Sequence, residues 1–345
     1  MHYVGVDLHK KTISVCVVIR VGAKRRVLQR RTFACIAVES IQQFFAGLGP
    51  YQVVVEATAS YEWFVRLVEP TADRVVLAHP GKLRVIAEST RKTDKLDAQV
   101  LAEFLALDMI PEAWRPTPRV RQHRALVRQR HYIQKRITSV KNKLRHILAN
   151  YNADIPELFT PKGRTYLAEL QLCDADRFTA DMLLTELDQH YERKHGVTVK
   201  LRDFARQAGI AEREAREVLD SIPYVGTLTI DIVLAEVGDI RRFGSQRKAT
   251  AYAGLAPGIR ESAGRGQQLG ISKAGSPLLR WALIETAWRL VGRTRRWGFL
   301  YHRLKKRCGV KKAIVAVARR LWCVMVSMLH RGEKYCMASE ALATP

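Results

Sequence analysis

Short apolar runs rich in β-branched residues open the chain and constrain its fold more than any other feature. Residues 3–7 and 13–19 predict two strands joined by a polar turn, and residues 27–34 predict a third. Further along, apolar residues recur at helical spacing and alternate with short apolar runs. The predicted helices are 38–48, 61–69 and 94–107, and the predicted strands between them are 52–56 and 74–78.

Three strands in series followed by α-β-α-β-α is the element order of a ribonuclease H-like, or RuvC-like, α/β fold. In such a fold the central strands place carboxylates near one end of the sheet. Asp7 lies in the first strand and Glu56 ends the fourth, while Asp94 and Asp97 are one helical turn apart and share a helix face. An unpaired charge in an apolar strand is costly, so Asp7 above all needs a partner.

These four acids predict a shared divalent cation. Carboxylate oxygens are hard ligands that suit Mg²⁺ or Mn²⁺. Two such ions, about 4 Å apart, activate the attacking oxygen and stabilise the leaving oxygen of a phosphodiester. Each acid also has a purely structural interpretation. Asp94 or Glu56 would cap a helix, and Asp97 would pair with Lys92 or Lys95.

The charge of the chain points to a polyanionic partner. Its 345 residues carry 58 Lys and Arg against 33 Asp and Glu, a formal net charge of +25, which repels itself unless a polyanion neutralises it. We expect nucleic acid rather than a membrane, because the apolar stretch 313–329 is interrupted by two arginines and is too short to cross a bilayer. The six cysteines show no zinc or C-x-x-C spacing, and a cytoplasmic location is expected.

A long basic helix is predicted after residue 111. Residues 113–153 contain 11 Lys and Arg and no Asp or Glu, and residues 119–150 contain no Gly or Pro. A solvated face usually mixes both charge signs, so this pattern favours contact with a phosphate backbone, although a solvated scaffold is the alternative. The candidate contacts are Arg119, Arg121, Arg124, Arg128, Arg130, Lys135, Arg136, Lys141, Lys143 and Arg145. A second helix over 180–195 would form an antiparallel, coiled-coil-like hairpin with it.

The C-terminal region is predicted to be mostly helical. Residues 219–226 followed by 227–237 read as helix, Pro-x-x-Gly turn and helix, a helix-hairpin-helix form whose turn amides can hold a phosphate. A loop rich in Gly and Arg is expected over 254–275, followed by two or three closing helices. The expected domains are a catalytic domain at 1–110, a helical insert at 111–200 and a helical domain at 201–345.

Several motifs resemble those of insertion-sequence transposases with a RuvC-like DEDD domain, and of the similar Piv-type DNA invertases. In the N-terminal half they are 5–10 (GVDLHK), 54–58 (VVEAT) and 92–98 (KTDKLDA). In the C-terminal half they are 222–226 (IPYVG), 237–239 (VGD), 252–257 (YAGLAP) and 269–275 (LGISKAG). The resemblance implies a DNA-cleaving homo-oligomer, a dimer or tetramer, and some members of this family are guided by a bridge RNA.

The resemblance also implies a serine nucleophile in the C-terminal domain. Ser262 occupies the place of the second serine in the family's Ser-Ser-Gly-Gly pattern, although Glu261 and Ala263 depart from it. From the residues alone, Ser262 is an ordinary loop serine between Arg260 and Arg265, whose guanidinium groups would bind a scissile phosphate.

Two other serines need consideration. Ser272, beside Lys273 in the matched motif, is a competing contact to phosphate. Ser276 precedes a proline and an apolar helix, so it is interpreted as a structural helix cap.

The sequence therefore predicts a DNA transposase or site-specific recombinase with Asp7, Glu56, Asp94, Asp97 and Ser262 as its catalytic residues. Two alternatives remain open. A RuvC-like nuclease would hydrolyse DNA with metal-activated water and need no serine. A non-catalytic nucleic-acid-binding protein would need neither the four acids nor the serine for catalysis.

Overall fold

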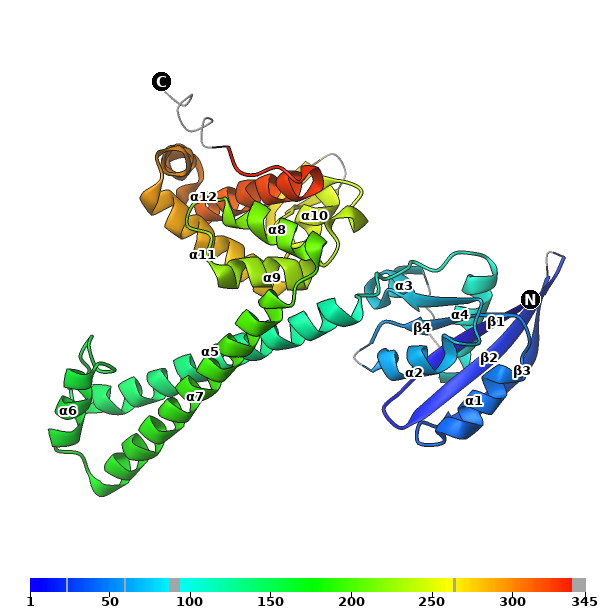
Figure 1. The fold of residues 1–345 in the computed structure, drawn as a ribbon, viewed down its shortest axis with the longest axis horizontal. Coiled ribbons are helices and arrows are strands. Elements are labelled where there is room, and N and C mark those ends of the chain that lie inside the picture. The colour runs from blue at the N-terminus through cyan, green and yellow to red at the C-terminus, as the bar shows by residue number, and fades with distance from the viewer. Residues whose placement is uncertain (23, 59, 87–93, 263–264, 337–345) are drawn as a thin grey trace. The chain divides into compact units, whose positions relative to one another are not determined.

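The computed structural model describes the chain except for residues 23, 59, 87–93, 263–264 and 337–345. The side chains of residues 84–86, 94–96, 259–262 and 265–269 also lie outside the description. The chain divides into two compact units, Met1–Arg115 and Pro116–Pro345, and each has its own core (Figure 1).

The first unit is built on a five-stranded mixed sheet. Its strands are β1 (His2–Leu8), β2 (Thr12–Val21), β3 (Lys24–Ala34), β4 (Tyr51–Glu56) and β5 (Arg74–Ala78), and they lie in the order β3-β2-β1-β4-β5. The first three strands pair antiparallel, whereas β1 pairs with β4 and β4 with β5 in parallel. The three-strand series followed by alternating helices and strands confirms the predicted mixed α/β order.

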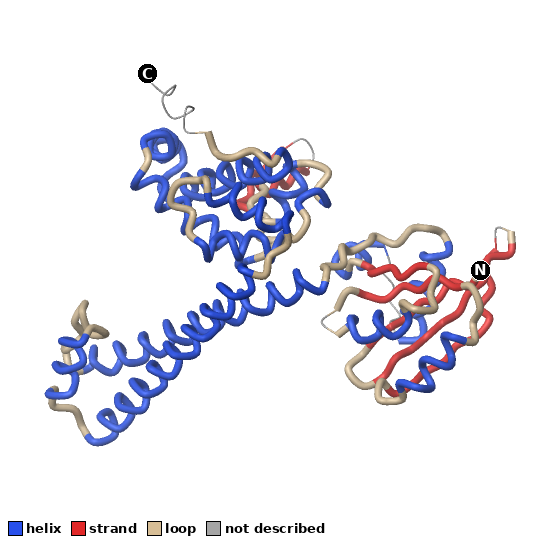
Figure 2. Tube along the Cα trace, viewed as in Figure 1, coloured by secondary structure: helices blue, strands red, loops and turns tan. Residues whose placement is uncertain are grey.

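Helices cover both faces of this sheet (Figure 2). On one face, α1 (Val38–Ala46) and α2 (Tyr61–Val68) pack aromatic and aliphatic side chains such as Phe45 and Phe64 against the strands. On the other, α4 (Asp94–Ala106) places Leu101 and Leu105 against β4 and β5. A short helix, α3 (Pro80–Ile86), which the sequence analysis did not anticipate, follows β5.

The second unit begins with two long helices that lie antiparallel. They are α5 (Pro118–Asn150) and α7 (Asp174–Arg206), joined through α6 (Pro161–Glu169). The start of α5 meets the end of α7, where Arg130 Nε donates to Thr198 Oγ1 at 3.0 Å. The end of α5 meets the start of α7, where the Tyr151 hydroxyl donates to Asp176 at 2.7 Å. The predicted antiparallel hairpin of helices is present.

Helix α7 is longer than the predicted 180–195 and runs through the expected boundary at residue 200. Gly196 directly follows the predicted end, and glycine in a helix interior costs roughly 0.5–1 kcal/mol relative to alanine. Packing outweighs that cost, because Val197 and Leu201, which both follow the glycine, contact buried clusters. Tertiary contacts therefore carry the helix past the glycine.

The rest of the second unit packs around Trp297 and Trp322, which are almost fully buried. Its helices are α8 (Ile210–Asp220), α9 (Thr227–Val237), the 3-10 turn η1 (Ile240–Arg242), α10 (Gln246–Tyr252), α11 (Pro277–Arg293) and α12 (Arg295–Arg331). One expectation is wrong here: 254–275 is not only a loop, because β6 (Pro257–Ser262) and β7 (Arg265–Ile271) form an antiparallel hairpin. The strands were not predicted because the many glycines and charged residues of this segment lack the apolar pattern typical of a strand.

Helix α12 is the one described helix that is long and apolar enough by composition to cross a membrane. Half of its most apolar window is buried inside the protein, where Leu321, Trp322 and Met325 belong to the core of the second unit. Its apolar character is accounted for by this packing. The helix is also broken at Gly309, whose φ of 76° is left-handed.

Candidate active site and nucleic-acid interface

Strand alternation places Asp7 and Glu56 on the same face of the sheet. Val6 of β1 pairs with Val55 of β4, so both acids directly follow this pair at the carboxyl ends of parallel strands. Val54 packs in the cluster formed with α4, and Glu56, two residues later, points to that same face. The two carboxylates therefore lie on neighbouring strands, on the face of the sheet that α4 covers.

Helix α4 lies directly on β1. A β-carbon on Gly5 would overlap the carbonyl oxygen of Ala98 and the backbone nitrogen of Ala102. Only glycine allows an approach this close, and Ala98 and Ala102 are buried against the strands. Asp97, which is half-buried, immediately precedes Ala98, so the helix brings its backbone to the strand that carries Asp7.

The Asp7 carboxylate is mostly buried, with 16% of the side chain exposed, and its Oδ2 lies 3.0 Å from Nε2 of the more exposed His9. Among the described side chains, no group of three or more His, Cys, Asp or Glu lies close enough together to hold a metal ion. Asp94 is the first residue of α4, and its side chain lies outside the described residues. Carboxylate oxygens on one sheet face nevertheless match the donor chemistry that Mg²⁺ prefers.

Ser262 is the last residue of β6 and pairs with Arg265 across the hairpin end. The side chains of Ser262, Arg260 and Arg265 lie outside the described residues. The expected position in an open turn is corrected to a strand end, because the Gly-rich segment pairs with itself instead of remaining irregular. The hairpin thus presents Ser262 at its tip.

The base of this hairpin is held by close backbone contacts between two of the matched motifs. A β-carbon on Gly275 would overlap the carbonyl group of Tyr252, and Gly254 has a φ of +66°. Ser272 N–H donates to the Ala256 carbonyl at 2.8 Å, fixing the two motifs to each other. Both glycines are therefore required by packing rather than by chemistry.

Ser272 and Lys273 are exposed beside this hairpin base, and Lys273 has a left-handed φ of 55°. Ser276 is confirmed as a helix cap, since its hydroxyl accepts from Leu279 N–H at 3.2 Å and Pro277 is the first residue of α11. Its hydroxyl therefore has a structural role.

The predicted helix, turn and helix are present at α8 and α9. Gly226 precedes the first residue of α9, and Tyr224 has a left-handed φ of 61° with 46% of its surface exposed. The Arg293 guanidinium lies 5.3 Å from the Tyr224 ring, and the Arg289 guanidinium lies beside Gly226. The turn is accompanied by positive charge on α11.

Much of the positive charge on α5 is paired inside the protein. Arg128 donates to both carboxylate oxygens of Glu236 at 2.8 and 3.0 Å, and Arg124 donates to the carbonyl groups of Ala235 and Glu236. Glu236 is fully buried, and although burial raises its pKa, the bond and charge of Arg128 outweigh that effect, so the pKa lies below its ordinary value. These cations hold α5 to the end of α9.

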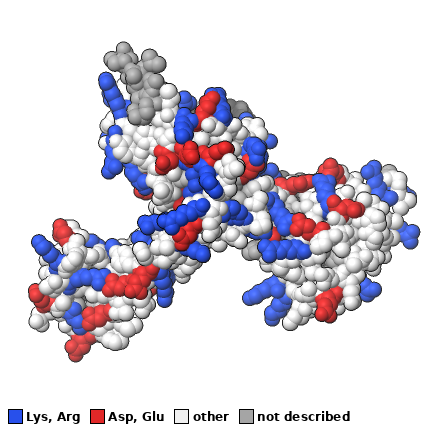
Figure 3. All heavy atoms as spheres, in the orientation of Figure 1, with Lys and Arg blue, Asp and Glu red and all other residues white. Residues whose placement is uncertain are grey.

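Other cations of α5 also have acidic or buried partners. Arg119 pairs with Glu212, Arg136 with Glu186 and Arg145 with Asp154. Arg121 donates to the Pro116 carbonyl, Lys141 lies over the Phe159 ring, and burial lowers the pKa of Arg130. Lys135 and Lys143 are exposed, and Figure 3 shows acidic side chains among the basic ones on the hairpin. The acids come from outside 113–153, so the stretch alone did not reveal them.

A buried polar network was missed by the sequence analysis. His123 lies 3.1 Å from Asp231, which accepts from Arg216 at 2.8 Å, and Arg216 also pairs with Glu212 at 3.0 Å. His123 and Asp231 are both more than 90% buried. The signal was present in α9, where Asp231 and Glu236 interrupt an otherwise apolar helix and therefore need partners.

Two transposase family models match this chain. Residues 4–153 match the model of the DEDD-type IS110 transposase domain, which has a ribonuclease H-like fold, and residues 216–303 match that of the IS116/IS110/IS902 transposase family. The chain carries both transposase domains of the IS110/IS116 family, as its motifs predicted.

Curated relatives cover nearly the same length. The chain is 27% identical to the transposase for insertion sequence element IS1111A of Coxiella burnetii, over 96% of this chain and 90% of the relative. It is 26% identical to the transposase for IS1328 of Yersinia enterocolitica, over 82% of each. It is also 24% identical to the pilin gene-inverting protein of Moraxella lacunata, over 96% of this chain and 97% of the relative. Both kinds of relative were expected from the motifs.

Proposed function

We propose that this transposase cleaves and rejoins DNA through two separate groups of residues, an acidic set and a serine. The acidic set is Asp7, Glu56, Asp94 and Asp97, and the nucleophile is Ser262. The observation that supports the acidic set most strongly is the seating of α4 on Gly5, since it brings a helix with two acids against the strand that carries Asp7.

In this proposal the four carboxylates hold Mg²⁺ or Mn²⁺, which when bound stabilises charge on the scissile phosphate. Ser262 Oγ attacks phosphorus, so that an Oγ–P bond forms and the P–O3′ bond breaks. The serine proton passes to a carboxylate, and the departing O3′ takes up a proton to become a 3′-hydroxyl. Attack by another 3′-hydroxyl reverses these changes and releases the serine, which conserves the phosphodiester bond.

The second unit supplies binding in this proposal. Lys273 and the exposed lysines of α5 contact phosphate, and the Pro-x-x-Gly turn offers amides to a strand backbone. Copies of the chain assemble as a dimer or tetramer in the cytoplasm. A structured guide RNA is a further partner in this proposal, because of the resemblance to members that use one.

A covalent-adduct assay on DNA carrying the element ends tests the chemistry. We expect a protein–DNA adduct with wild type and with Ser272→Ala, and none with Ser262→Ala. Asp7→Asn and Glu56→Gln should also abolish the adduct while leaving the unfolding temperature unchanged within a few degrees. Cleavage by Ser262→Ala at the wild-type rate would instead support hydrolysis by water, and adduct formation by Asp7→Asn would remove the acidic set from the mechanism.

A further inference from the structure

Helix α12 folds back on itself and encloses a groove. Gly309 is non-helical, with φ 76° and ψ 168°, so the segments before and after it face each other. The groove between them has a volume of about 440 Å³, within the range of roughly 300–1,000 Å³ that is usual for ligand pockets. It belongs wholly to the second unit and takes no part in the acidic or serine sites.

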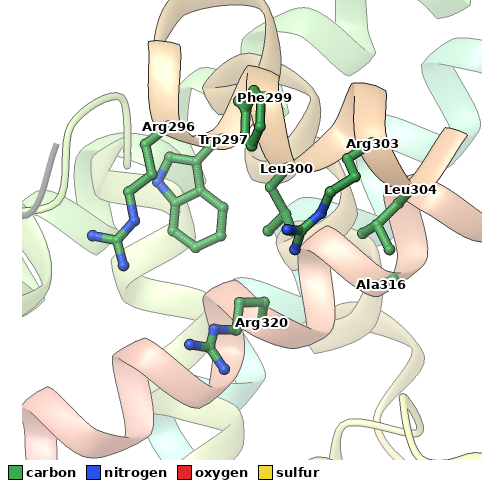
Figure 4. Close-up of a pocket in the computed structure, with 8 residues that line it drawn as sticks. All are labelled: Arg296, Trp297, Phe299, Leu300, Arg303, Leu304, Ala316 and Arg320. Carbon is green, nitrogen blue, oxygen red and sulfur yellow. The ribbon is translucent and has the colours of Figure 1, made fainter. Parts of the chain in front are cut away.

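The wall of this groove combines an apolar surface with positive charge (Figure 4). Trp297, Phe299 and Leu300 come from the first segment. Arg296 and Arg303 from the first segment and Arg320 from the second add three guanidinium groups, and none of the eight described residues that line the groove is acidic. Arg303 and Arg320 are exposed, and Phe299 is 60% exposed.

Two further observations indicate a ligand. The Trp297 ring is 99% buried, yet within the described residues its Nε1–H has no hydrogen-bond acceptor. A buried donor without an acceptor is costly, so this indole N–H is an unsatisfied polar atom in a residue that lines the groove. In addition, residues 286–332 contain 13 Lys and Arg and no Asp or Glu, so α12 itself places no acidic side chain beside the groove.

We infer that this groove binds an unpaired strand of DNA, with a base against Phe299 and phosphates on the three arginines. A single strand presents flat apolar bases and anionic phosphates together, which is the combination that this groove offers. A duplex presents its phosphates but keeps its bases stacked, so it would leave the apolar wall unused. The inference rests on the transposase function, because breaking and exchanging DNA strands exposes unpaired segments.

Fluorescence anisotropy with the full-length protein and a labelled oligothymidine tests the groove. Arg303→Gln with Arg320→Gln should weaken binding about fivefold or more and reduce the slope of log affinity against log salt by about 1.4. Phe299→Ala should weaken binding about fivefold but leave the salt slope unchanged, because it removes stacking and no charge. Arg303→Lys should keep the wild-type slope.

A charge-matched control is available on α7. Arg202→Gln with Arg206→Gln removes two exposed arginines far along the chain from α12 and should leave oligothymidine affinity within about twofold of wild type. Because all substituted arginines are exposed, the unfolding temperatures should agree, and that measurement separates lost binding from lost folding.

The inference is overturned if the groove variants bind oligothymidine like wild type, or if the control loses as much affinity. It is also overturned if the groove substitutions weaken the binding of duplex DNA or of oligouridine at least as much as the binding of oligothymidine. It is likewise overturned if polyglutamate competes for the protein as well as oligothymidine does. The oligouridine result would indicate RNA as the ligand, and the polyglutamate result would indicate an acidic protein. Asp7→Asn should retain oligothymidine affinity, so failure of the catalytic proposal leaves this test intact.

Discussion

Gly5 of β1 lies against the backbone of Ala98 on α4, with no room for a β-carbon between them. We therefore predict that Gly5→Ala pushes α4 away from the strand that carries Asp7. Overpacking of this kind costs about 1–3 kcal/mol, and strand cleavage should fall at least tenfold because Asp97 moves with the helix. Urea unfolding and the adduct assay measure the two effects.

Gly196→Ala is the matched control for that substitution. Gly196 lies inside α7 with open space around its β-position, so alanine should stabilise the protein by about 0.5–1 kcal/mol and leave cleavage unchanged. If Gly5→Ala proves equally harmless, α4 does not rest on β1 as described.

The cations of α5 should separate into two groups by experiment. Lys135→Gln with Lys143→Gln should reduce the salt slope of duplex binding by about 1.8 if both lysines contact phosphate, with no change in stability. Arg124→Gln with Arg128→Gln should instead destabilise the protein and leave the slope unchanged, because these arginines bind α9. Binding titrations at several salt concentrations and thermal unfolding distinguish them. An unchanged slope for the lysine variant would mean that α5 is a scaffold only.

Breaking the pair between α5 and α9 should be costly because one partner is buried. Arg128→Met leaves the Glu236 carboxylate, which has no exposed surface, without its bidentate partner, at a cost of about 3 kcal/mol. Adding Glu236→Leu should recover much of that loss, because the buried charge that lost its partner is then removed as well. Urea unfolding of the single and double variants checks this, and equal stability of the two would contradict it.

The same pair predicts a dependence of stability on pH. The pKa of Glu236 lies below its ordinary 4.5 in the folded protein, since Arg128 outweighs the effect of burial. A lowered pKa gives stability that is fully present above pH 4.5 and is lost as the pH falls through the folded-state pKa.

The free energy of unfolding of wild type should therefore exceed that of Glu236→Gln most strongly near neutral pH. This difference in the free energy of unfolding between wild type and variant should become smaller as the pH falls below about 4.5. A gap that stays constant down to about pH 3 would show that the carboxylate charge is not what Arg128 stabilises. Asp188, whose pKa is lowered by its hydrogen bond to Arg164 although burial opposes it, should add a smaller effect in the same direction.

The order of strands and helices in the first unit was predictable because each strand there has its own local sequence signal. Residues such as Val15 and Val53 are β-branched and buried, so alternation and propensity agree. The hairpin that ends at Ser262 gave no such signal, since its stability depends on pairing among glycines and arginines. The extension of α7 beyond residue 195 was missed for a related reason, because contacts with residues distant in the sequence stabilise it.

The acidic positions were predicted from strand ends and helical spacing, but the pairing of α5 was not. Arg128 and Glu236 are 108 positions apart, and Arg119 and Glu212 are 93 apart. A count of charges within 113–153 cannot include partners at that separation. Only the three-dimensional arrangement reveals which of these cations have partners within the protein.

The attachment of α5 to α9 also determines how the protein can be divided. A fragment that starts at residue 201 would keep Glu212 and Glu236 but lack Arg119 and Arg128, which bind them. The buried Glu236 would then lack its counter-ion, and Glu212 would keep only Arg216, so such a fragment should aggregate during expression. Recombinant work on the serine-bearing half should therefore start at residue 116, with the entire basic helix retained.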